Sequence, residues 1–340
     1  MIGLVYLGPH KLAFQDVPRP TLGERDVLLR VKACAICGSD VHGYEGITGR
    51  RTPPMIMGHE FGGVVEELGH CVSSLQPGDR VLATPSAGCG HCEFCRMNRP
   101  EMCSQRRVLG VGNINGALAE FCVVPAESLM TIPPGVSFVQ ATMVEPLTVA
   151  YHAFHRRPAQ AMEDVALIGV GTIGLLLLQI VRLANPRRIF VSDPIPEKLT
   201  RARRYGATDT LDPIKTDVVD AIMQATGGRG VDLAIEAVGF EESVQTAMAI
   251  ARLGGDVLVV GNASKMGQIH LQGLVTHELR LIGTYGGTPE FAPALDLISS
   301  GRVDLSPFTE VVWPFERGIE AFERLAAGES GLWKVILTME

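Results

Sequence analysis

Four of the eight cysteines in this chain fall within one short segment, CGHCEFCRMNRPEMC. Cys89, Cys92, Cys95 and Cys103 form a C-x2-C-x2-C-x7-C pattern, whose spacing allows four thiolates to converge on one tetrahedral zinc ion. Four sulfur ligands complete the tetrahedron, so such a site is structural and leaves no position for a substrate. We therefore expect His91, within the segment, to be a turn residue and not a ligand.

A second set of zinc-binding residue types is spread along the chain. Cys37 lies in CGSDVH, His59 and Glu60 lie in GHE, and Glu145 lies in EPL. Thiolate, imidazole and carboxylate all bind zinc, and three protein ligands plus a water form a catalytic site. Each residue alone also has a structural explanation: a buried small hydrophobe for the cysteine, a core histidine, a cap or ion-pair partner for a glutamate. Asp40 is a candidate for the carboxylate that orients the His59 imidazole.

Polar residues beside Cys37 extend this candidate site. Ser39 and His42 can form a hydroxyl–imidazole path for a proton. Tyr44 could donate a hydrogen bond to a hydroxylated substrate, or be an exposed loop tyrosine. The pair Arg50–Arg51 could recognise a phosphate or a carboxylate, although surface charge is the commoner explanation.

A glycine motif predicts a nucleotide site. Gly169, Gly171 and Gly174 spell G-x-G-x-x-G between the apolar segment VALI and the helical pattern TIGLLLLQ. The glycines permit a tight turn and close approach of the backbone to a pyrophosphate, which the helix N-terminus then stabilises. Asp193 ends the next apolar segment, IFVSD. A carboxylate there accepts hydrogen bonds from ribose hydroxyls and repels a 2′-phosphate, which favours NAD over NADP. Lys198 could lie over the adenosine ribose.

Two alternatives to this interpretation remain open. The glycine turn could serve packing only, with Asp193 as a helix cap. The basic residues Arg201, Arg203 and Arg204 are more often a solvated helix face than a phosphate clamp, although they keep NADP in consideration.

The elements that must position these residues change in character along the chain. The first 145 or so residues read as short strands broken by Gly and Pro, which predicts an all-β, barrel-like domain. From Asp164 onward, apolar strands alternate with helical stretches, which predicts βαβ units and a doubly wound parallel sheet. After about residue 290 the pattern predicts a helix within 314–328 and a final strand at 334–339.

Length and composition narrow the class of protein. With 340 residues the chain can form two domains, and its formal net charge of −7 disfavours a nucleic-acid partner. No basic N-terminal region precedes an apolar stretch, and no uninterrupted apolar run reaches the length of a membrane span. The other four cysteines show no disulfide pattern, so we expect a reducing, cytoplasmic environment and no membrane partner.

Taken together, the motifs of the chain resemble those of a known family. In order, CGSDVH, GHE followed by FGGVVEELG, PGDRV, the four-cysteine segment, EPL and GVGTIG are similar to the zinc-dependent medium-chain alcohol and polyol dehydrogenases. The resemblance covers essentially the whole chain. It implies a GroES-like β domain over 1–147 and 288–340, which carries two zinc ions, and a Rossmann NAD-binding domain over 148–287.

The resemblance also assigns roles to individual residues. It implies that Cys37, His59 and Glu60 hold the catalytic zinc, with Glu145 at the position of a third or alternative ligand that acts directly or through water. It gives Ser39 and His42 the proton relay. It further implies that the cofactor is contacted by Thr172, Ile173, Val238 and Val260 beside the glycines, and that the protein is a homo-oligomer, dimeric or tetrameric.

The reaction that follows is the reversible oxidation of a secondary alcohol, in a polyol, diol or sugar alcohol, to a ketone with NAD. Zinc would act as a Lewis acid as the hydroxyl proton leaves through Ser39 and His42. EPLTVAYHAFH resembles the sorbitol, butanediol and galactitol-phosphate branch, whereas GVGNINGALAEF resembles L-threonine 3-dehydrogenases, the close alternative. Two other classes compete less well: a zinc-free NADPH reductase, against which Cys37, His59 and Glu60 argue, and a nucleic-acid-binding zinc ribbon, against which the negative charge argues.

Overall fold

The computed structural model describes residues 1–340, which divide into two compact units. The first unit comprises residues 1–145 and 288–340, and the second comprises 146–287. The predicted fold class, a β domain joined to a doubly wound parallel sheet, is confirmed. None of its helices has both the length and the apolar character that crossing a membrane requires.

The first unit consists mainly of strands. β10, β6, β5, β3, β18 and β17 follow one another in its largest sheet, in which β9 also pairs with β3. A second sheet has the order β2-β1-β4, and β7 pairs with β8. The strands are β1 (Ile2–Gly8), β2 (Lys11–Asp16), β3 (Asp26–Ala35), β4 (Met55–Ile56), β5 (Glu60–Leu68), β6 (Arg80–Ala83), β7 (Ser86–Ala87), β8 (Arg107–Val108), β9 (Phe121–Pro125), β10 (Leu129–Thr131), β17 (Val312–Pro314) and β18 (Ile336–Thr338).

The central strand of this unit is β3, DVLLRVKACA, seven of whose ten residues are buried. It pairs antiparallel with β5, β9 and β18, so its backbone is bonded to partners on both edges. Short helices connect the strands, and a longer one packs near the C-terminus. These are α1 (Gly38–Tyr44), α2 (Glu93–Arg96), α3 (Phe138–Ala141), α10 (Phe291–Ser299) and α11 (Gly318–Ala326).

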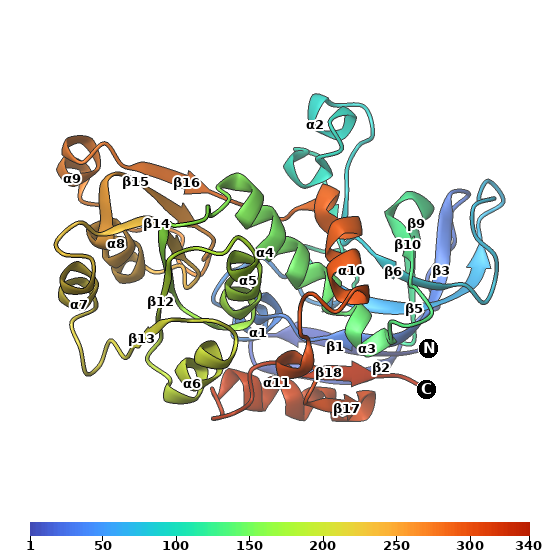
Figure 1. The fold of residues 1–340 in the computed structure, drawn as a ribbon. Coiled ribbons are helices and arrows are strands. Elements are labelled where there is room, and N and C mark those ends of the chain that lie inside the picture. The colour runs from blue at the N-terminus through green and yellow to red at the C-terminus, as the bar shows by residue number, and fades with distance from the viewer. The chain divides into compact units, whose positions relative to one another are not determined.

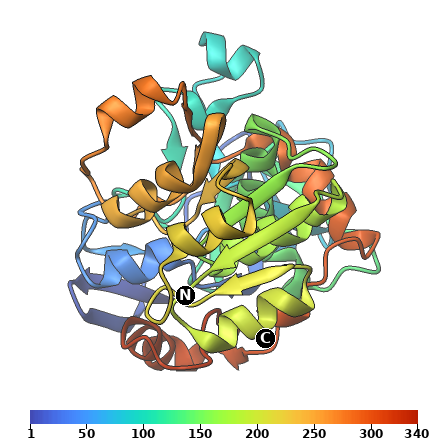
Figure 2. The ribbon, with the colours of Figure 1, turned by 60° about the vertical axis from the view of Figure 1, so that its left-hand side comes forward.

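The second unit is built on one six-stranded sheet with the order β13-β12-β11-β14-β15-β16. Every neighbouring pair in it is parallel, as the βαβ pattern predicts. Its strands lie side by side in Figure 2, with helices of the same unit packed over them. The strands are β11 (Asp164–Ile168), β12 (Arg188–Ser192), β13 (Asp209–Leu211), β14 (Val231–Glu236), β15 (Ala251–Val259) and β16 (Arg280–Gly283).

Helices follow the strands of this unit in alternation. The helix α5 is apolar on nearly all sides, and residues 174–181 are all buried, as expected for a helix enclosed within a fold. The helices are α4 (Val144–Arg156), which starts at the end of the first unit, α5 (Thr172–Leu183), α6 (Pro196–Arg204), α7 (Val218–Ala225), α8 (Glu241–Ile250) and α9 (Leu271–Thr276).

Candidate active site and metal centres

The end of β3 is where the scattered ligand candidates meet. Strand register places Ala35 opposite Glu60 of β5 on one side and opposite Ile336 of β18 on the other. The chain then continues through Ile36, whose N–H donates to the Val335 carbonyl at 3.0 Å. Cys37 follows as the N-cap of α1. Three segments far apart in the sequence are thereby fixed beside one another.

Cys37, His59 and Glu60 form a cluster at this point. One ligand atom from each lies within 4.8 Å of those of the other two. Glu60 is 1% exposed and His59 7% exposed, while Cys37 is partly buried. A thiol, an imidazole and a carboxylate in this arrangement match the donor types of a catalytic zinc site, so the residues fit such an ion.

Asp40 connects the helix start to the imidazole. Its Oδ2 accepts from the Cys37 N–H at 3.3 Å and lies 3.5 Å from His59 Nδ1, which has no closer hydrogen-bond partner. Its Oδ1 accepts from Arg51 Nη2 at 2.7 Å. Burial acts to raise the pKa of Asp40, but His59 and Arg51 outweigh it and hold that pKa well below its ordinary value. The carboxylate therefore stays charged where it can orient the ring.

Arg51 differs from its sequence interpretation. The sequence interpretation places it on the surface, or at a phosphate or carboxylate near the pocket entrance, whereas its side chain is 2% exposed and forms an ion pair with Asp40. It also donates to Ser39 Oγ at 3.2 Å. Space for its stem exists because Gly43 has no side chain: a Cβ there would lie 2.8 Å from Arg51 Cδ. Its role is to hold α1 and Asp40 in place.

Glu145 lies outside the three-residue cluster, at the start of α4. Burial raises the pKa of its carboxyl to about 7, and the nearby Glu60 carboxylate adds to the rise while His59 opposes it. The Glu145 carboxyl therefore interacts electrostatically with Glu60 and His59, although it is not one of the three clustered residues. Its predicted role as an alternative ligand stays a prediction.

Lys334 is a residue of this site that the sequence interpretation missed. Its ammonium forms an ion pair with Glu60 Oε2, and the two side chains are 4% and 1% exposed. It reaches the site because β18 pairs with β3 two residues further on. A lysine directly before the apolar run VILTM was the available signal, since a charge entering a buried strand needs a partner.

The other residues predicted beside Cys37 lie on α1. The Ser39 N–H donates to Cys37 Sγ at 3.4 Å, and His42 follows one turn later on the same helix, partly exposed. Tyr44 corrects an expectation: it is 4% exposed, and its ring packs on His10 and Phe322 with centroid distances of 5.1 and 5.7 Å. It is a core residue and not an exposed loop tyrosine, and its predicted contact with substrate stays a prediction.

The four-cysteine segment forms a second cluster, in which all four sulfur atoms lie within 4.8 Å of one another. It surrounds α2, which projects from the strands of its own unit (Figure 1). Backbone N–H groups point at the sulfurs: Cys92 N–H donates to Cys89 Sγ and Cys89 N–H to Cys103 Sγ, each at 3.4 Å. N–H groups of His91 and Cys92 lower the pKa of Cys89 to about 6, whereas burial and the neighbouring cysteines raise the pKa of Cys95 to about 11. Such a loop is prepared to hold thiolates around a metal.

The glycine motif forms the turn between β11 and α5 in the second unit. Gly169 has φ +89, and a Cβ on Gly174 would lie 2.1 Å from the Gly169 carbonyl oxygen. Gly171 is the N-cap residue of α5, and no side chain there accepts a hydrogen bond from the helix N–H groups. Thr172 and Ile173 in the first turn are partly exposed. This arrangement of free N–H groups at a helix N-terminus suits an anionic ligand.

Asp193 follows β12 and is tied to this turn. Its Oδ2 accepts from the Val170 N–H and its Oδ1 from the Ile195 N–H, both at 3.0 Å. Each oxygen keeps a second lone pair, so a role toward a ribose is compatible with these bonds. Lys198 Nζ lies 3.8 Å from Asp193 Oδ2.

Glu236 organises the remaining predicted cofactor contacts and was also missed from the sequence. It is fully buried at the end of β14, and its Oε1 accepts from the N–H groups of Val238 and Gly239 at 2.8 and 2.7 Å. Its carbonyl accepts from the Val260 N–H at 2.8 Å. Glu236 therefore positions both segments, the first through its side chain and the second through its backbone carbonyl.

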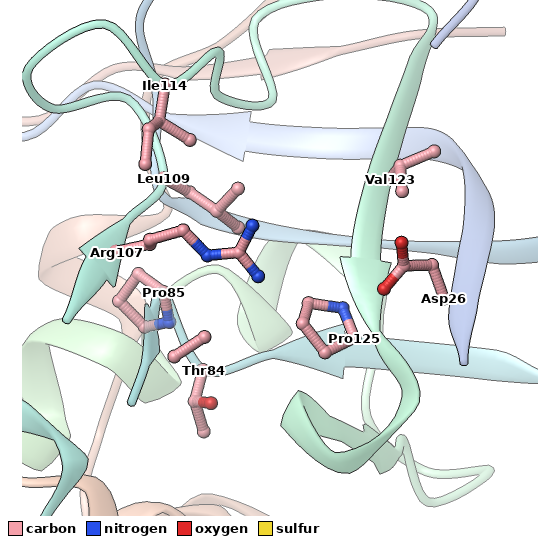
Figure 3. Close-up of a pocket in the computed structure, with 9 residues that line it drawn as sticks. Asp26, Thr84, Pro85, Arg107, Leu109, Ile114, Val123 and Pro125 are labelled. Atoms are coloured by element: carbon pink, nitrogen blue, oxygen red, sulfur yellow. The ribbon is translucent and has the colours of Figure 1, made fainter. Parts of the chain in front are cut away.

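A pocket in the first unit lies apart from these residues. The Arg107 guanidinium points into it, with the Asp26 carboxylate across from it (Figure 3). None of the predicted site residues lines this pocket, so it is not the candidate active site. Its walls are Asp26, Thr84, Pro85, Ala87, Arg107, Leu109, Ile114, Val123 and Pro125.

The fold and these clusters define a class, the two-domain zinc-binding dehydrogenases. Residues 23–134 match the alcohol dehydrogenase GroES-like domain family, and residues 172–300 match the zinc-binding dehydrogenase family. The chain belongs to the zinc-dependent medium-chain alcohol and polyol dehydrogenases.

Relatives and solved structures match over nearly the whole chain. An L-idonate 5-dehydrogenase of Vitis vinifera is 32% identical over 96% of this chain and 92% of its own length. A probable D-xylulose reductase A of Neosartorya fischeri is 32% identical over 96% and 94%. The alcohol dehydrogenase of Thermus sp. ATN1 is 30% identical with a TM-score of 0.92 over 100% of both chains. A zinc-binding dehydrogenase of Sinorhizobium meliloti 1021 bound to NADP is 30% identical with a TM-score of 0.91 over 99% of both.

Proposed function

We propose that this dehydrogenase reversibly oxidises a secondary alcohol of a polyol, diol or sugar alcohol to the ketone, with NAD as hydride acceptor. The observation that carries the proposal is the convergence of Cys37, His59 and Glu60 at the end of β3. The names of the two relatives, an L-idonate dehydrogenase and a D-xylulose reductase, favour polyols over L-threonine. Phosphorylated sugar alcohols remain within the proposed class.

The residues would divide the work as follows. Cys37, His59 and Glu60 would hold the zinc, with Glu145 as an alternative ligand, and the ion would supply Lewis acidity that favours loss of the substrate hydroxyl proton. Asp40 keeps the His59 imidazole oriented. Ser39 and His42 would carry the proton away from the substrate hydroxyl.

In the second unit, the turn formed by Gly169, Gly171 and Gly174 would bind the pyrophosphate, with Thr172 and Ile173 in the first turn of α5. Asp193 would accept hydrogen bonds from the adenosine ribose, beside Lys198, and the segments of Val238 and Val260 would contact the cofactor. The carboxylate of Asp193 supports NAD, whereas one relative structure contains NADP. The preference for NAD over NADP is therefore tested by supplying each of the two cofactors.

We further propose a zinc ion in the cluster Cys89, Cys92, Cys95 and Cys103, a homo-oligomeric assembly, either dimer or tetramer, and a cytoplasmic location. The cytoplasmic location rests on the sequence, in which the four cysteines outside the cluster show no disulfide pattern. Size-exclusion chromatography with light scattering tests the assembly.

The decisive test is a substrate panel assayed by NADH or NADPH formation. Polyols, butanediols, sugar-alcohol phosphates and L-threonine are each supplied with NAD or NADP. We expect turnover with a polyol or diol and NAD, and none with L-threonine. Reduction of NAD by L-threonine alone would overturn the proposal.

Metal content tests the site itself. Wild-type protein is expected to contain two zinc ions per chain, and Cys37→Ser one, with loss of turnover. The control is Cys71→Ser, an exposed cysteine outside both clusters, which should retain both zinc ions and activity. An active Cys37→Ser enzyme with unchanged zinc content would refute the assignment.

A further inference from the structure

A third group of metal-binding residue types lies on the surface of the first unit, away from both clusters described above. Glu24 precedes β3, and His70 and Cys71 follow β5. One ligand atom from each of the three residues lies within 4.8 Å of those of the other two. We propose that this surface triad is a third metal site, which binds a late first-row divalent cation such as Ni²⁺, Co²⁺ or Zn²⁺.

Backbone contacts hold the two loops of the surface triad together without any metal. The Cys71 N–H donates to the Glu24 carbonyl, and the Gly69 N–H donates to the Asp26 carbonyl, both at 2.9 Å. The approach is so close that a Cβ on Gly69 would lie 2.2 Å from the Gly23 carbonyl oxygen. The backbone positions of the three residues are therefore fixed beside one another, which reduces the entropy lost on binding a metal.

The side chains themselves are free to adjust. His70 Nε2 lies 3.8 Å from Glu24 Oε2, which is too long for a hydrogen bond, and these side chains are 72% and 74% exposed. Cys71 is the single exposed cysteine of the chain. Rotation of these exposed side chains can bring all three donors to one ion, at the cost of the 3.8 Å contact between His70 and Glu24.

The donor set selects the class of cation. A thiolate, an imidazole and a carboxylate suit zinc and its neighbours in the first transition row, whereas Mg²⁺ and Ca²⁺ require oxygen ligands. Three protein ligands leave further positions for water. Since the surface triad is exposed, its metal exchanges with solvent, unlike an ion enclosed by buried residues.

The test is Ni²⁺ binding to the full chain after loading with zinc and removal of excess metal. We expect one Ni²⁺ per chain above the zinc content, measured by equilibrium dialysis with elemental analysis. Binding should protect Cys71 from alkylation in peptide mass spectra. Since loss of even an outer-shell partner weakens metal binding about 10- to 100-fold, His70→Ala and Cys71→Ser should weaken it at least as much.

The matched control is Glu67→Gln, which removes an exposed carboxylate of β5 outside the surface triad. It should bind Ni²⁺ as the wild type does, whereas Glu24→Gln should bind more weakly. Zinc content and circular dichroism verify that each variant is folded. The proposal fails if wild type takes up no Ni²⁺, or if the triad variants bind it as tightly as Glu67→Gln. A fall of the zinc content below two ions per chain as Ni²⁺ binds would also overturn it, because Ni²⁺ would then occupy one of the other two clusters.

Discussion

Lys334 and Glu60 form an ion pair that is almost wholly removed from water. Removing a charge from water is costly, and the attraction between the partners offsets this cost only while both are present. Deleting one partner leaves the other as an uncompensated buried charge. The pair also engages Oε2 of Glu60, so the lysine is a positioning residue for the proposed ligand set.

We therefore predict that Lys334→Met lowers the free energy of unfolding by about 3–5 kcal/mol, measured by urea denaturation of protein stripped of metal, in which no cation compensates Glu60. Adding Glu60→Gln should return part of the loss, because no charge is then left buried. The matched control is Lys215→Met, whose ion pair with Asp212 is 72% exposed on the lysine side and should contribute at most about 1 kcal/mol. Equal losses for the two lysines would contradict the prediction.

At the scale of elements, the turn between β11 and α5 contains two glycines whose lack of a side chain has different reasons. Gly174 is required by packing, since an added Cβ would meet the backbone oxygen of Gly169, which cannot move aside. Gly171 has φ −66, and an added Cβ would meet nothing within 4 Å. The fold does not require its lack of a side chain, so we predict that this lack serves the ligand.

The two substitutions should therefore separate stability from cofactor binding. Gly174→Ala should reduce the free energy of unfolding by about 1–3 kcal/mol, as overpacking does. Gly171→Ala should leave it within about 0.5 kcal/mol but raise the dissociation constant for NADH, measured by fluorescence titration. Tight NADH binding by Gly171→Ala would show that the pyrophosphate lies elsewhere.

Element by element, local sequence patterns predicted the fold well. The apolar segments and glycines around 164–193 identified β11, α5 and β12, because a βαβ unit is encoded by neighbouring residues. The same holds for the four-cysteine segment. Lys334 and Glu60 are 274 residues apart, and only the pairing of β18 with β3 joins them. Long-range register of this kind is not readable from one sequence, which is why Lys334 was missed. Arg51 and Glu236 bind partners 11 and 2–3 residues away, but nothing in the residue pattern marks their side chains as buried.

At the scale of the whole molecule, each unit has its own charge network. In the second unit, Asp256 of β15 accepts from Arg157 at 2.5 Å and from Arg280 at 2.6 Å. Asp232 of β14 is bonded in the same way to Arg229 and Arg252. These carboxylates are 2% and 8% exposed, and arginine hydrogen bonds outweigh burial to lower both pKa values.

The lowered pKa values of these carboxyls determine how the stability of the fold changes with pH. A carboxyl whose folded pKa is below its ordinary value of 3.8 stabilises the fold above that pH, and the contribution is lost as the pH falls through the folded value. We predict that the urea midpoint of the second unit declines below about pH 4. Asp256→Asn should be less stable at neutral pH and decline less steeply. If the urea midpoint of Asp256→Asn falls with pH as steeply as that of wild type, the Asp256 carboxyl is not the cause of the pH effect.

The position of β18 has a consequence for biosynthesis. All four residues of the Cys89–Cys103 cluster leave the ribosome early and within one short segment, so that loop can acquire its metal while translation continues. The cluster of Cys37, His59 and Glu60 lacks the counter-charge of Lys334 until the last residues of the chain emerge. We therefore expect the centre of Cys37, His59 and Glu60 to mature after the Cys89–Cys103 cluster, once residue 334 is in place.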